Sequence, residues 1–476
     1  MPRVSTVIYS VRRFVKNFNN DDRYLDSHIS LKTTFLPLGV VSRVAAGFGA
    51  IFSRSMGSGV SSRALSFYLE NETCKPGELP IKEMKYDDKV LHLADWPSKE
   101  DCAKFSTSDM LSSSNLSSWN FDVWKTARED MPTICSSIIL HRALPTKFNI
   151  KFEKWCGLYR QVEYNMSTSM NPYHNFIHVV DVMQTCASFL GEMGVSSVLN
   201  DTDILALYLS AFLHDIGHPG LNNVYQINAE TALALCYNDI SVLENHHCAL
   251  AFAVFKQPNS DIFQDVPLIL RKTIRKAMIE MILSTDMMSH FTLTDELSDC
   301  VTRNFSPLDS ISALNSVVLP DKDRTVLLRS ILHAADISNP AKVWETSKKW
   351  SDLVVQEFFA QGDLEKAQAL PVSMNMDRCF AVQDEISLNF SDFIVAPFFF
   401  TLLKAFPKLE KSVRYLETNR YEWDSIMRNR VTKSTAIEEG QKLEILGRWT
   451  ARETDFLSKL KAALEVADNR LTNYEI

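Results

Sequence analysis

Glycine is scarce in this chain of 476 residues, with 14 in all, and turn dipeptides are few. A β-rich sandwich or barrel needs frequent turns, so this shortage argues against one and favours helices. Cysteine pairs of the CxxC type are also lacking, because the nine cysteines lie far apart between Cys74 and Cys379. An odd number of widely spaced cysteines is typical of free thiols in a reducing compartment.

A long uninterrupted apolar run is lacking as well. The best stretch, residues 35–52, is broken by Pro37, Ser42 and Arg43, so we expect no transmembrane segment. The net charge of −8 is unevenly distributed: residues 1–65 contain nine Lys or Arg and three Asp, and the remaining 411 residues therefore carry −14. An acidic body of this kind argues against nucleic acid as a partner.

The basic N-terminus has two interpretations. Its first residues, MPRVSTVIYSVRRFVKNF, fit the basic amphipathic helix of a mitochondrial presequence, and no Glu occurs before Glu70. Aspartates soon interrupt this pattern, and a flexible basic arm fits nearly as well. The sequence favours a cytoplasmic protein, with a mitochondrial one as the alternative.

From about Asn120 onward the pattern changes to long amphipathic helices, each with an apolar stripe that leads into a polar cluster. We predict an all-α fold with a compact multi-helix bundle over residues 111–435. A basic N-terminal extension over 1–110 precedes it, and a C-terminal helix over 436–476 follows. The spacing in that helix fits either a coiled-coil seam or a face packed on the domain, and it favours packing. The spaced residues are Leu457, Leu460, Leu464, Ala467 and Leu471.

Two short runs contain side chains typical of a site for divalent cations: YHNFIHVVDV at residues 173–182 and AFLHDIGHPG at 211–220. Neutral imidazoles and carboxylates are the ligands that such cations bind. Each run contains two histidines four residues apart, which on a helix would project from one face. The two pairs are His174 with His178 and His214 with His218.

Aspartates accompany these histidines. Asp215 directly follows a histidine, so its carboxylate can reach one metal and still bridge to a second. A further pairing of His333 with Asp336 lies far downstream in ILHAADISNP. Three such segments, each flanked by apolar helical sequence, indicate a metal centre far more strongly than a single His-Asp dipeptide does.

Taken together, these segments resemble the class I cyclic nucleotide phosphodiesterases, which are HD-type metal phosphohydrolases. Six pieces follow the order of that family: YHNFIHVVDV, HDIGHPGLNN, YNDISVLENHH, STDMMSH, HAADISNP and QEFFAQGD. The likeness covers roughly residues 120–425. It implies a catalytic domain that hydrolyses a 3′,5′-cyclic nucleotide, cyclic GMP or cyclic AMP, to the 5′-monophosphate with two divalent cations.

The resemblance also implies roles for single residues. His174 would be the general acid that protonates the departing ribose O3′, and Glu357 would orient it. Asp215 would bridge from a tight cation, usually Zn²⁺, to a second cation, Mg²⁺ or Mn²⁺. The ligands of the tight cation would be His178, His214, Asp215 and Asp336.

The remaining matched positions each have a plain structural alternative. Four lie around the metal ligands in the family, where a hydrogen bond within the protein explains them as well as catalysis does: His218, Glu244, His246 and His290. Asp181, three residues after His178, is expected to orient a histidine rather than to bind metal. Six match the nucleotide pocket, although a Tyr or Asn at a helix end is commonly only a cap. They are Tyr173, Met287, Asn339, Val354, Ser387 and Phe390. His247 is expected to be a packed or exposed neighbour.

The sequence departs from the family at two places. Gly217 stands where most members have an acidic residue, which removes an acceptor from the water shell of the second cation. Ser387 stands where the family has a purine-reading glutamine, and Asn389 where it has a glycine. A hydroxyl makes one good hydrogen bond where an amide makes two, so we expect base recognition to weaken by about 1–3 kcal/mol. Gln383 and Gln356 are the alternative readers.

Three functions remain open on the sequence. The first is an active cyclic nucleotide phosphodiesterase with altered base preference, supported by the retention of all four ligands and His174. The second is a structural or interaction subunit, a homodimer or larger assembly held through the C-terminal helix or the N-terminal arm. The third is an HD-domain phosphohydrolase acting on another phosphoester. The sequence favours the first, because carboxylates are costly to bury without a partner.

Overall fold

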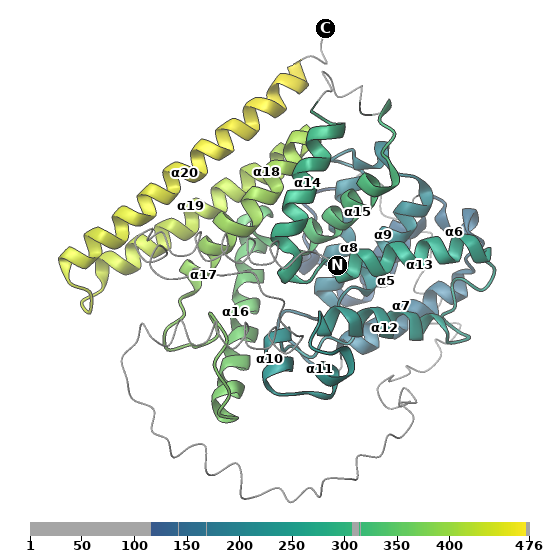
Figure 1. The fold of residues 1–476 in the computed structure, drawn as a ribbon, viewed down its shortest axis with the longest axis horizontal. Coiled ribbons are helices and arrows are strands. Elements are labelled where there is room, and N and C mark those ends of the chain that lie inside the picture. Colours follow the sequence, from purple (N-terminus) through teal and green to yellow (C-terminus); the bar gives the residue numbers. More distant parts are fainter. Residues whose placement is uncertain (1–115, 141, 168, 307–313, 315, 473–476) are drawn as a thin grey trace, which may run out of the picture. The chain divides into compact units, whose positions relative to one another are not determined.

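The structure is a computed structural model that describes residues 116–140, 142–167, 169–306, 314 and 316–472. The predicted N-terminal extension and its proposed targeting segment lie outside the described residues. Every regular element that the structure describes is helical, which confirms the all-α prediction (Figure 1).

In chain order, the first half of the fold contains α5 (Met131–Leu140), α6 (Leu144–Lys147), α7 (Phe152–Ser167), α8 (Phe176–Leu190), α9 (Asp201–Leu213), α10 (Asn223–Asn228), α11 (Ala232–Tyr237) and α12 (Val242–Phe255). The second half contains α13 (Leu268–Leu283), α14 (His290–Asn304), α15 (Asp321–Asp336), α16 (Trp344–Ala367), α17 (Gln383–Phe390), α18 (Ala396–Ala405), α19 (Glu410–Lys433) and α20 (Glu439–Thr472). Short 3₁₀ turns include η6 (Met287–Ser289) and η8 (Asn339–Ala341), and a π-helical turn, η9 (Ser391–Val395), joins α17 to α18.

The helices that position the site are apolar on nearly all sides, and this places them in the centre of the core. In α8 every residue but Ile177 is buried, and in α9 every residue after Thr202 is buried. A helix that is hydrophobic all round can lower its free energy only by being covered on every face. Accordingly α8 packs against α5, α9 and α15, and α13 covers α9. The polar residues at the ends of these helices are therefore held by a rigid core.

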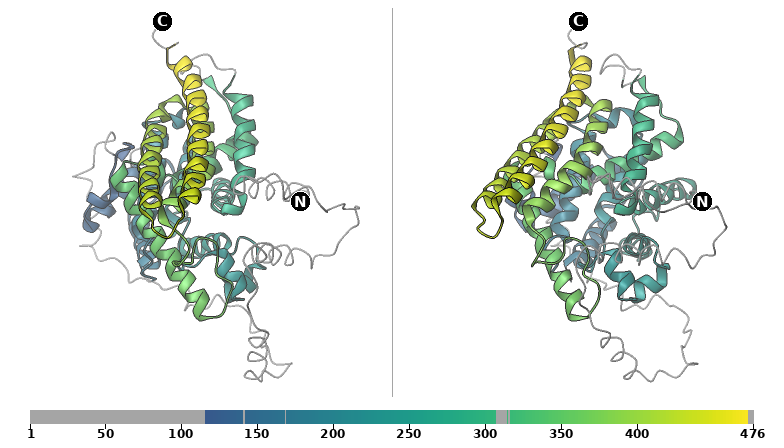
Figure 2. Two further views of the ribbon diagram at one scale, coloured as in Figure 1. Left: turned by 90° about the vertical axis from the view of Figure 1, so that its left-hand side faces the viewer. Right: turned by 60° about the vertical axis from the view of Figure 1, so that its left-hand side comes forward.

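The C-terminal helix α20 packs against α18 and α19 (Figures 1 and 2). Phe456, Leu460, Leu464 and Ala467 are buried in the same hydrophobic core as α8 and α9, whereas Leu457 is 43% exposed. The leucine-spaced face is thus packed on the domain, as its spacing favours. The side chain of Leu471 lies outside the described residues, and the domain limits at 110 and 435 stay predictions.

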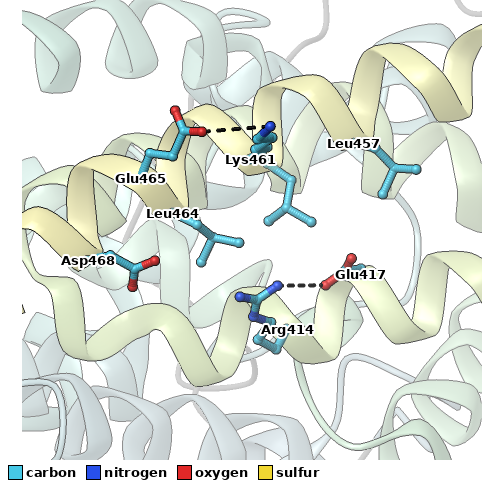
Figure 3. A pocket seen from close by; sticks show the side chains of 8 residues that line it. Arg414, Glu417, Leu457, Lys461, Leu464, Glu465 and Asp468 are labelled. Carbon is cyan, nitrogen blue, oxygen red and sulfur yellow. Dashed lines mark hydrogen bonds and ion pairs between the residues drawn. The ribbon is translucent and has the colours of Figure 1, made fainter.

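A hollow lies between α19 and α20, and both charged and apolar side chains line it (Figure 3). Two ion pairs lie within its walls, between Arg414 and Glu417 on α19 and between Lys461 and Glu465 on α20. The other residues that line it are Leu457, Leu460, Leu464 and Asp468. Its lining contains no histidine or cysteine, so this hollow is separate from the metal-type residues that the sequence singles out.

One continuous helical run, Gln383–Ala405, is long and apolar enough by length and composition to cross a membrane. It comprises α17, η9 and α18, and 61% of its most apolar window is buried inside the structure. Packing against α14, α19 and α20 accounts for this apolar character. The described part of the chain therefore shows no clear transmembrane helix.

Candidate active site

The cap of α8 separates the first pair of histidines. The Oδ1 atom of Asn175 accepts hydrogen bonds from the backbone N–H groups of Ile177 (2.9 Å) and His178 (3.3 Å), so the helix begins at Phe176. His178 lies in the first turn, whereas His174 precedes the helix. The prediction that both histidines project from one helix face is therefore wrong, because a cap intervenes between them.

The second pair is separated by the end of α9. The helix ends at Leu213, and the chain then turns through Gly217, whose φ is +74°. The prediction that His214 and His218 share a helix face is therefore wrong as well. A Cβ atom at position 217 would lie 2.6 Å from Leu250 Cδ2. Backbone conformation and packing thus both account for the glycine that stands in place of an acidic residue.

These turns bring together the four residues that the sequence predicts as metal ligands. His178 Nε2 lies 3.1 Å from Asp336 Oδ1 and 3.4 Å from Asp215 Oδ2. His214 Nε2 lies 3.2 Å from Asp215 Oδ2 and 3.4 Å from Asp336 Oδ1. One ligand atom from each residue lies within 4.8 Å of all the others. Residues from α8, the end of α9 and the end of α15 thus form one cluster.

The chemistry of this donor set fits a divalent cation. His214 Nδ1 lies 2.9 Å from the carbonyl oxygen of Ala211, an arrangement that places the proton of the neutral ring on Nδ1. Its Nε2 atom is buried and has no hydrogen-bond partner among the described residues. This nitrogen faces two carboxylates, an arrangement suited to a metal, which would take the lone pair of the neutral ring and neutralise the carboxylates.

The electrostatics of the cluster also indicate that a positive charge belongs among these four residues. Burial alone lowers the pKa of His178 and of His214, but Asp215 and Asp336 outweigh it and raise both pKa values above the ordinary range. Burial raises the pKa of each carboxyl group, but the two imidazoles outweigh it and hold both values low. Two buried carboxylates are stable here only with a positive charge between them.

A second group is formed by His174, His218 and Glu357. One possible ligand atom from each of these residues lies within 4.8 Å of those of the other two. Glu357 is buried on α16, where one oxygen accepts hydrogen bonds from the backbone N–H groups of Tyr173 (2.9 Å) and His174 (3.1 Å). Its other oxygen is hydrogen-bonded to His174 Nδ1.

This contact sets the charges of both partners. Burial lowers the pKa of His174, but the Glu357 carboxylate outweighs it and raises that pKa to about 9. Burial raises the pKa of Glu357, but His174 outweighs it and lowers that pKa to about 2. At neutral pH His174 is therefore an imidazolium, and the proton on Nε2 is the one available for transfer.

His218 and His247 stay neutral behind this ion pair. The His218 ring stacks on that of His174, with centroids 3.9 Å apart, and its Nδ1 accepts a hydrogen bond from Gly220 N at 2.9 Å. Burial and the cationic His174 hold the pKa of His218 well below its ordinary value. Of the two alternatives for His247, packed or exposed, the structure shows a packed side chain, and its Nε2 also lies 3.8 Å from Asp215 Oδ1. Nothing in the sequence distinguishes it for that contact.

Other predicted neighbours lie outside both groups. His290 Nδ1 lies 2.9 Å from His333 Nε2, and both rings pack against Phe398. Burial lowers the pKa of His290 to about 3 and that of His333 to about 4, so both rings are neutral. His333 and Asp336, which the sequence suggests as a pair, therefore belong to different groups. Asp336 lies in the metal-type cluster, whereas His333 packs with His290 in the core.

Three more predicted positions also lie outside the two groups. Glu244 accepts hydrogen bonds from Asn223 Nδ2, at 2.9 and 3.2 Å, and burial together with Asp286 raises its pKa to about 8. His246 is buried beside Gly217, and burial lowers its pKa to about 4. Asp181 is buried in α8, and burial raises its pKa.

Of the residues matched to the nucleotide pocket, Tyr173 and Asn339 touch, with Asn339 Nδ2 donating to the Tyr173 hydroxyl at 2.6 Å. Ser387 Oγ lies 2.9 Å from Ser351 Oγ on α16, and Val354 and Phe390 are half-buried. Met287 in η6 is 43% exposed.

The alternative base reader Gln383 is engaged within the same region. Its Nε2 donates to Ser351 Oγ at 3.0 Å and to Asp352 Oδ1 at 2.6 Å. Both amide hydrogens are thereby used, and the amide oxygen is the atom that remains for a ligand.

Sequence reasoning missed two residues that shape the site. Asn171 Nδ2 donates to the carbonyl oxygens of His174 (2.9 Å) and His218 (2.7 Å) and so ties the two loops together. Trp350 packs its ring against those of Tyr173 and His178. A signal for Trp350 was present, because it lies seven residues before Glu357 on one helix, which places both on the same face.

The model of the 3′5′-cyclic nucleotide phosphodiesterase family matches residues 173–416. The high-affinity cGMP-specific 3′,5′-cyclic phosphodiesterase 9A of Homo sapiens is 33% identical over 332 residues, which are 67% of this chain and 53% of that protein. The 3′,5′-cyclic-nucleotide phosphodiesterase regA of Dictyostelium discoideum is 33% identical over 312 residues, 66% of this chain and 38% of that protein. The chain thus spans about half the length of these relatives, or less.

Solved structures show the same fold. The phosphodiesterase domain of the RhoPDE fusion protein from Salpingoeca rosetta superposes with a TM-score of 0.60 at 29% identity, over 68% of this chain and 98% of that one. LmjPDEB1, solved in complex with IBMX, superposes with a TM-score of 0.62 at 26% identity, over 70% of this chain and 99% of that one.

The family match begins at Tyr173, beside the His174–Glu357 pair, and extends past Asp336, so it includes every residue of the two clusters. It also covers more than half of the chain. Members of this family use divalent metals, for which the His–Asp cluster is suited. This protein therefore belongs to the 3′,5′-cyclic nucleotide phosphodiesterase family.

Proposed function

We propose that this protein hydrolyses a 3′,5′-cyclic nucleotide, cyclic AMP or cyclic GMP, to the 5′-monophosphate. The observation that carries the proposal is the placement of a buried His–Asp cluster beside a cationic histidine. The rings of His178 and His174, one from each group, lie with centroids 5.8 Å apart. A site for cations and a proton donor therefore face the same small region, as the cleavage of a phosphodiester requires.

The cluster would hold the tighter of two cations. Two imidazoles and two carboxylates suit Zn²⁺, and the ligands would be His178, His214, Asp215 and Asp336. Asp215 would also reach a second cation, Mg²⁺ or Mn²⁺, which binds few carboxylates and keeps most of its water. When bound, these cations would supply Lewis acidity to the phosphate and to an attacking water.

His174 would be the general acid. As water adds to phosphorus and releases one proton to the solvent, the bond from phosphorus to O3′ breaks and its electron pair passes to O3′. His174 Nε2 would give its proton to this oxygen, which leaves as the ribose 3′-hydroxyl. Glu357 would hold the ring by its Nδ1–H and keep the proton in place at neutral pH. The stacked, neutral His218 would limit rotation of the ring without competing for the proton.

One observation favours a second function, a phosphodiesterase-fold subunit with little turnover. The purine-reading amide is missing at position 387, and the Ser387 hydroxyl is paired with Ser351. Such a subunit would act through assembly, by the C-terminal helix or the N-terminal arm.

Removal and restoration of metal tests the proposal. The purified chain is dialysed against a chelator and then supplied with Zn²⁺, Mg²⁺ or Mn²⁺, singly and in pairs, with cyclic AMP or cyclic GMP as substrate. We expect no turnover in the chelated protein and recovery with Zn²⁺ together with Mg²⁺ or Mn²⁺. Full metal loading without any release of 5′-monophosphate would refute the proposed enzyme and favour the subunit.

A further inference from the structure

The stretch 387–390, where the proposed function places base recognition, is held from several sides. The Ser387 hydroxyl bonds to Ser351 on α16, and Phe390 packs against the main core. Leu388 is completely buried in a second apolar cluster. That cluster is made largely by α19 and α20, with Trp423, Met427, Val431 and Trp449.

Asn389 is held by the C-terminal helix. Arg452 of α20 donates from Nη1 to Asn389 Oδ1 at 2.9 Å and from Nη2 to Asp392 Oδ2 at 2.9 Å. Its guanidinium group lies 3.9 Å from the ring centre of Trp449 and 4.6 Å from that of Phe393. Two hydrogen bonds and two aromatic faces fix this side chain in one orientation.

The backbone is irregular where Arg452 makes this contact. Asp392 lies in the π-helical turn η9, which directly follows Phe390 and connects the pocket stretch to the buried helix α18. A π-helical turn inserts one extra residue and is frequent at functional sites. Arg452 thus contacts the chain on both sides of Phe390, at the point where the helix is least regular.

The start of α17 is held in a similar way from α19. Arg430 forms ion pairs with Asp384, at 2.8 Å, and with Glu385, at 2.6 Å. Each end of α17 is therefore bound to the C-terminal helices by an arginine. The contacts of Arg452 are the ones that reach the base-recognition stretch itself.

We propose that Arg452 is a positioning residue for nucleotide recognition, which acts by tying Asn389 and the turn after Phe390 to α20. The proposal rests on the proposed function. Arg452 lies outside the family match, which ends at residue 416. Its contact gives a physical role to Asn389, which stands at a position where the family has a glycine. The C-terminal helix is then part of the substrate site, although it contributes no group that touches the nucleotide.

Substitution of Arg452 can be made without leaving a buried charge unpaired. Asp392 is also bound by Arg420, at 2.8 Å, so Arg452→Ala leaves that carboxylate with one partner. Arg452→Lys keeps the charge but loses the planar fork that serves two acceptors. The matched control is Lys459→Ala on the same helix, where the exposed Lys459 pairs with Asp455 one turn away.

The kinetic test separates KM from kcat. Loss of a charge-assisted hydrogen bond at the recognition stretch should raise KM for the cyclic nucleotide about 10-fold in Arg452→Ala, with a smaller rise in Arg452→Lys. The value of kcat should change less than about 2-fold, because the reacting groups are untouched. Asn389→Ala should raise KM similarly, and the double variant should add little to either single one. A fall in kcat with KM unchanged would overturn the proposal.

Hydrogen exchange provides a test that does not depend on turnover. In Arg452→Ala the backbone amides of residues 387–395 should exchange faster than in the original protein, and in Lys459→Ala they should not. Unchanged exchange in this segment would refute the positioning role even if the enzyme is active. Conversely, faster exchange in a protein that hydrolyses no cyclic nucleotide would support the positioning role of Arg452 but refute the proposed function.

Discussion

Glu357 holds the proton on His174. A first prediction at the scale of single residues follows from this contact. His174→Ala should leave both cations bound, because His174 is not among the four clustered ligands, but it should slow hydrolysis by about 10²–10⁴-fold, as loss of a general acid does. The measurement is kcat with metal content determined on the same samples.

An analogue with a better leaving group needs less protonation, so the loss in His174→Ala should shrink for it. An equal loss with both substrates would show that His174 only shapes the pocket. Loss of metal from the variant would also contradict this assignment.

The pH dependence follows from the same pair. The acid form of His174 is present below its pKa, so activity should fall as pH rises through about 9, to which the Glu357 carboxylate raises that pKa. Glu357→Gln removes the negative charge and therefore lowers the pKa, because burial then acts unopposed by this partner. The alkaline limb of the kcat profile should move to lower pH. A limb that stays in place would exclude His174 as its source.

Base selection is the third prediction at this scale. Because Ser387 makes one hydrogen bond where the family's glutamine makes two, the protein should discriminate poorly between cyclic AMP and cyclic GMP or show a high KM. Ser387→Gln should lower KM by a factor equivalent to roughly 1–3 kcal/mol. The double variant with Asn389→Gly also loses the Arg452 contact, so it should improve less. Strong preference and low KM in the original protein would instead indicate that Gln383 reads the base.

Individual site residues could be predicted from the sequence best where their side-chain chemistry is distinctive. The composition of the cluster at His178, His214 and Asp215 is that of a metal site. Asp336 was a candidate in its own distant segment, and the resemblance placed it in the same ligand set. Asn171 could not be found in this way, because an asparagine that ties two loops together looks like any turn residue. His247 was equally hidden beside His246, since either could have faced the core.

At the element scale, Gly217 decides how the site is assembled. Its φ is +74°, and a Cβ atom at this position would lie only 2.6 Å from Leu250 Cδ2, so there is little room for a side chain. Gly217→Ala should therefore reduce the free energy of unfolding by about 1–3 kcal/mol, through strain and overpacking. Urea denaturation with zinc present measures it.

The control for this prediction is Gly440→Ala in α20. No atom lies within 4 Å of a Cβ at that position, and alanine is the better helix former. This variant should be neutral or more stable by about 0.5–1 kcal/mol. If Gly217→Ala were as stable as Gly440→Ala, the turn would tolerate a side chain and the glycine would need another explanation.

Helices as elements could be predicted from the sequence, but their ends could not. Apolar composition indicates where α8 and α9 lie, because both are buried on nearly all sides. Apolar periodicity indicates α15, because it reports the face that this helix buries. The i to i+4 spacing of histidines was misleading, since Asn175 begins α8 after His174 and α9 ends before His214. The functional side chains lie at helix ends, where capping and turn geometry override periodicity.

At the scale of the whole molecule, the site depends on contacts between distant parts of the chain. His178 and Asp336 are separated by 158 positions, and His174 and Glu357 by 183. No local pattern predicts such a meeting, and only the resemblance to a family, which the comparisons confirm, brought these segments together. The C-terminal helix lies beyond that resemblance, so its contacts with Asn389 and Asp392 could be found in the structure alone.

The most direct test of the central claim follows metal and product together in the original protein and in Asp336→Ala, with Asp265→Ala, a change at an exposed ion pair, as the control. We predict that the original and control proteins bind zinc stoichiometrically and convert a cyclic nucleotide to its 5′-monophosphate, whereas Asp336→Ala loses the tight metal and the activity at once. Stoichiometric zinc in Asp336→Ala, or undiminished hydrolysis without it, would contradict the account.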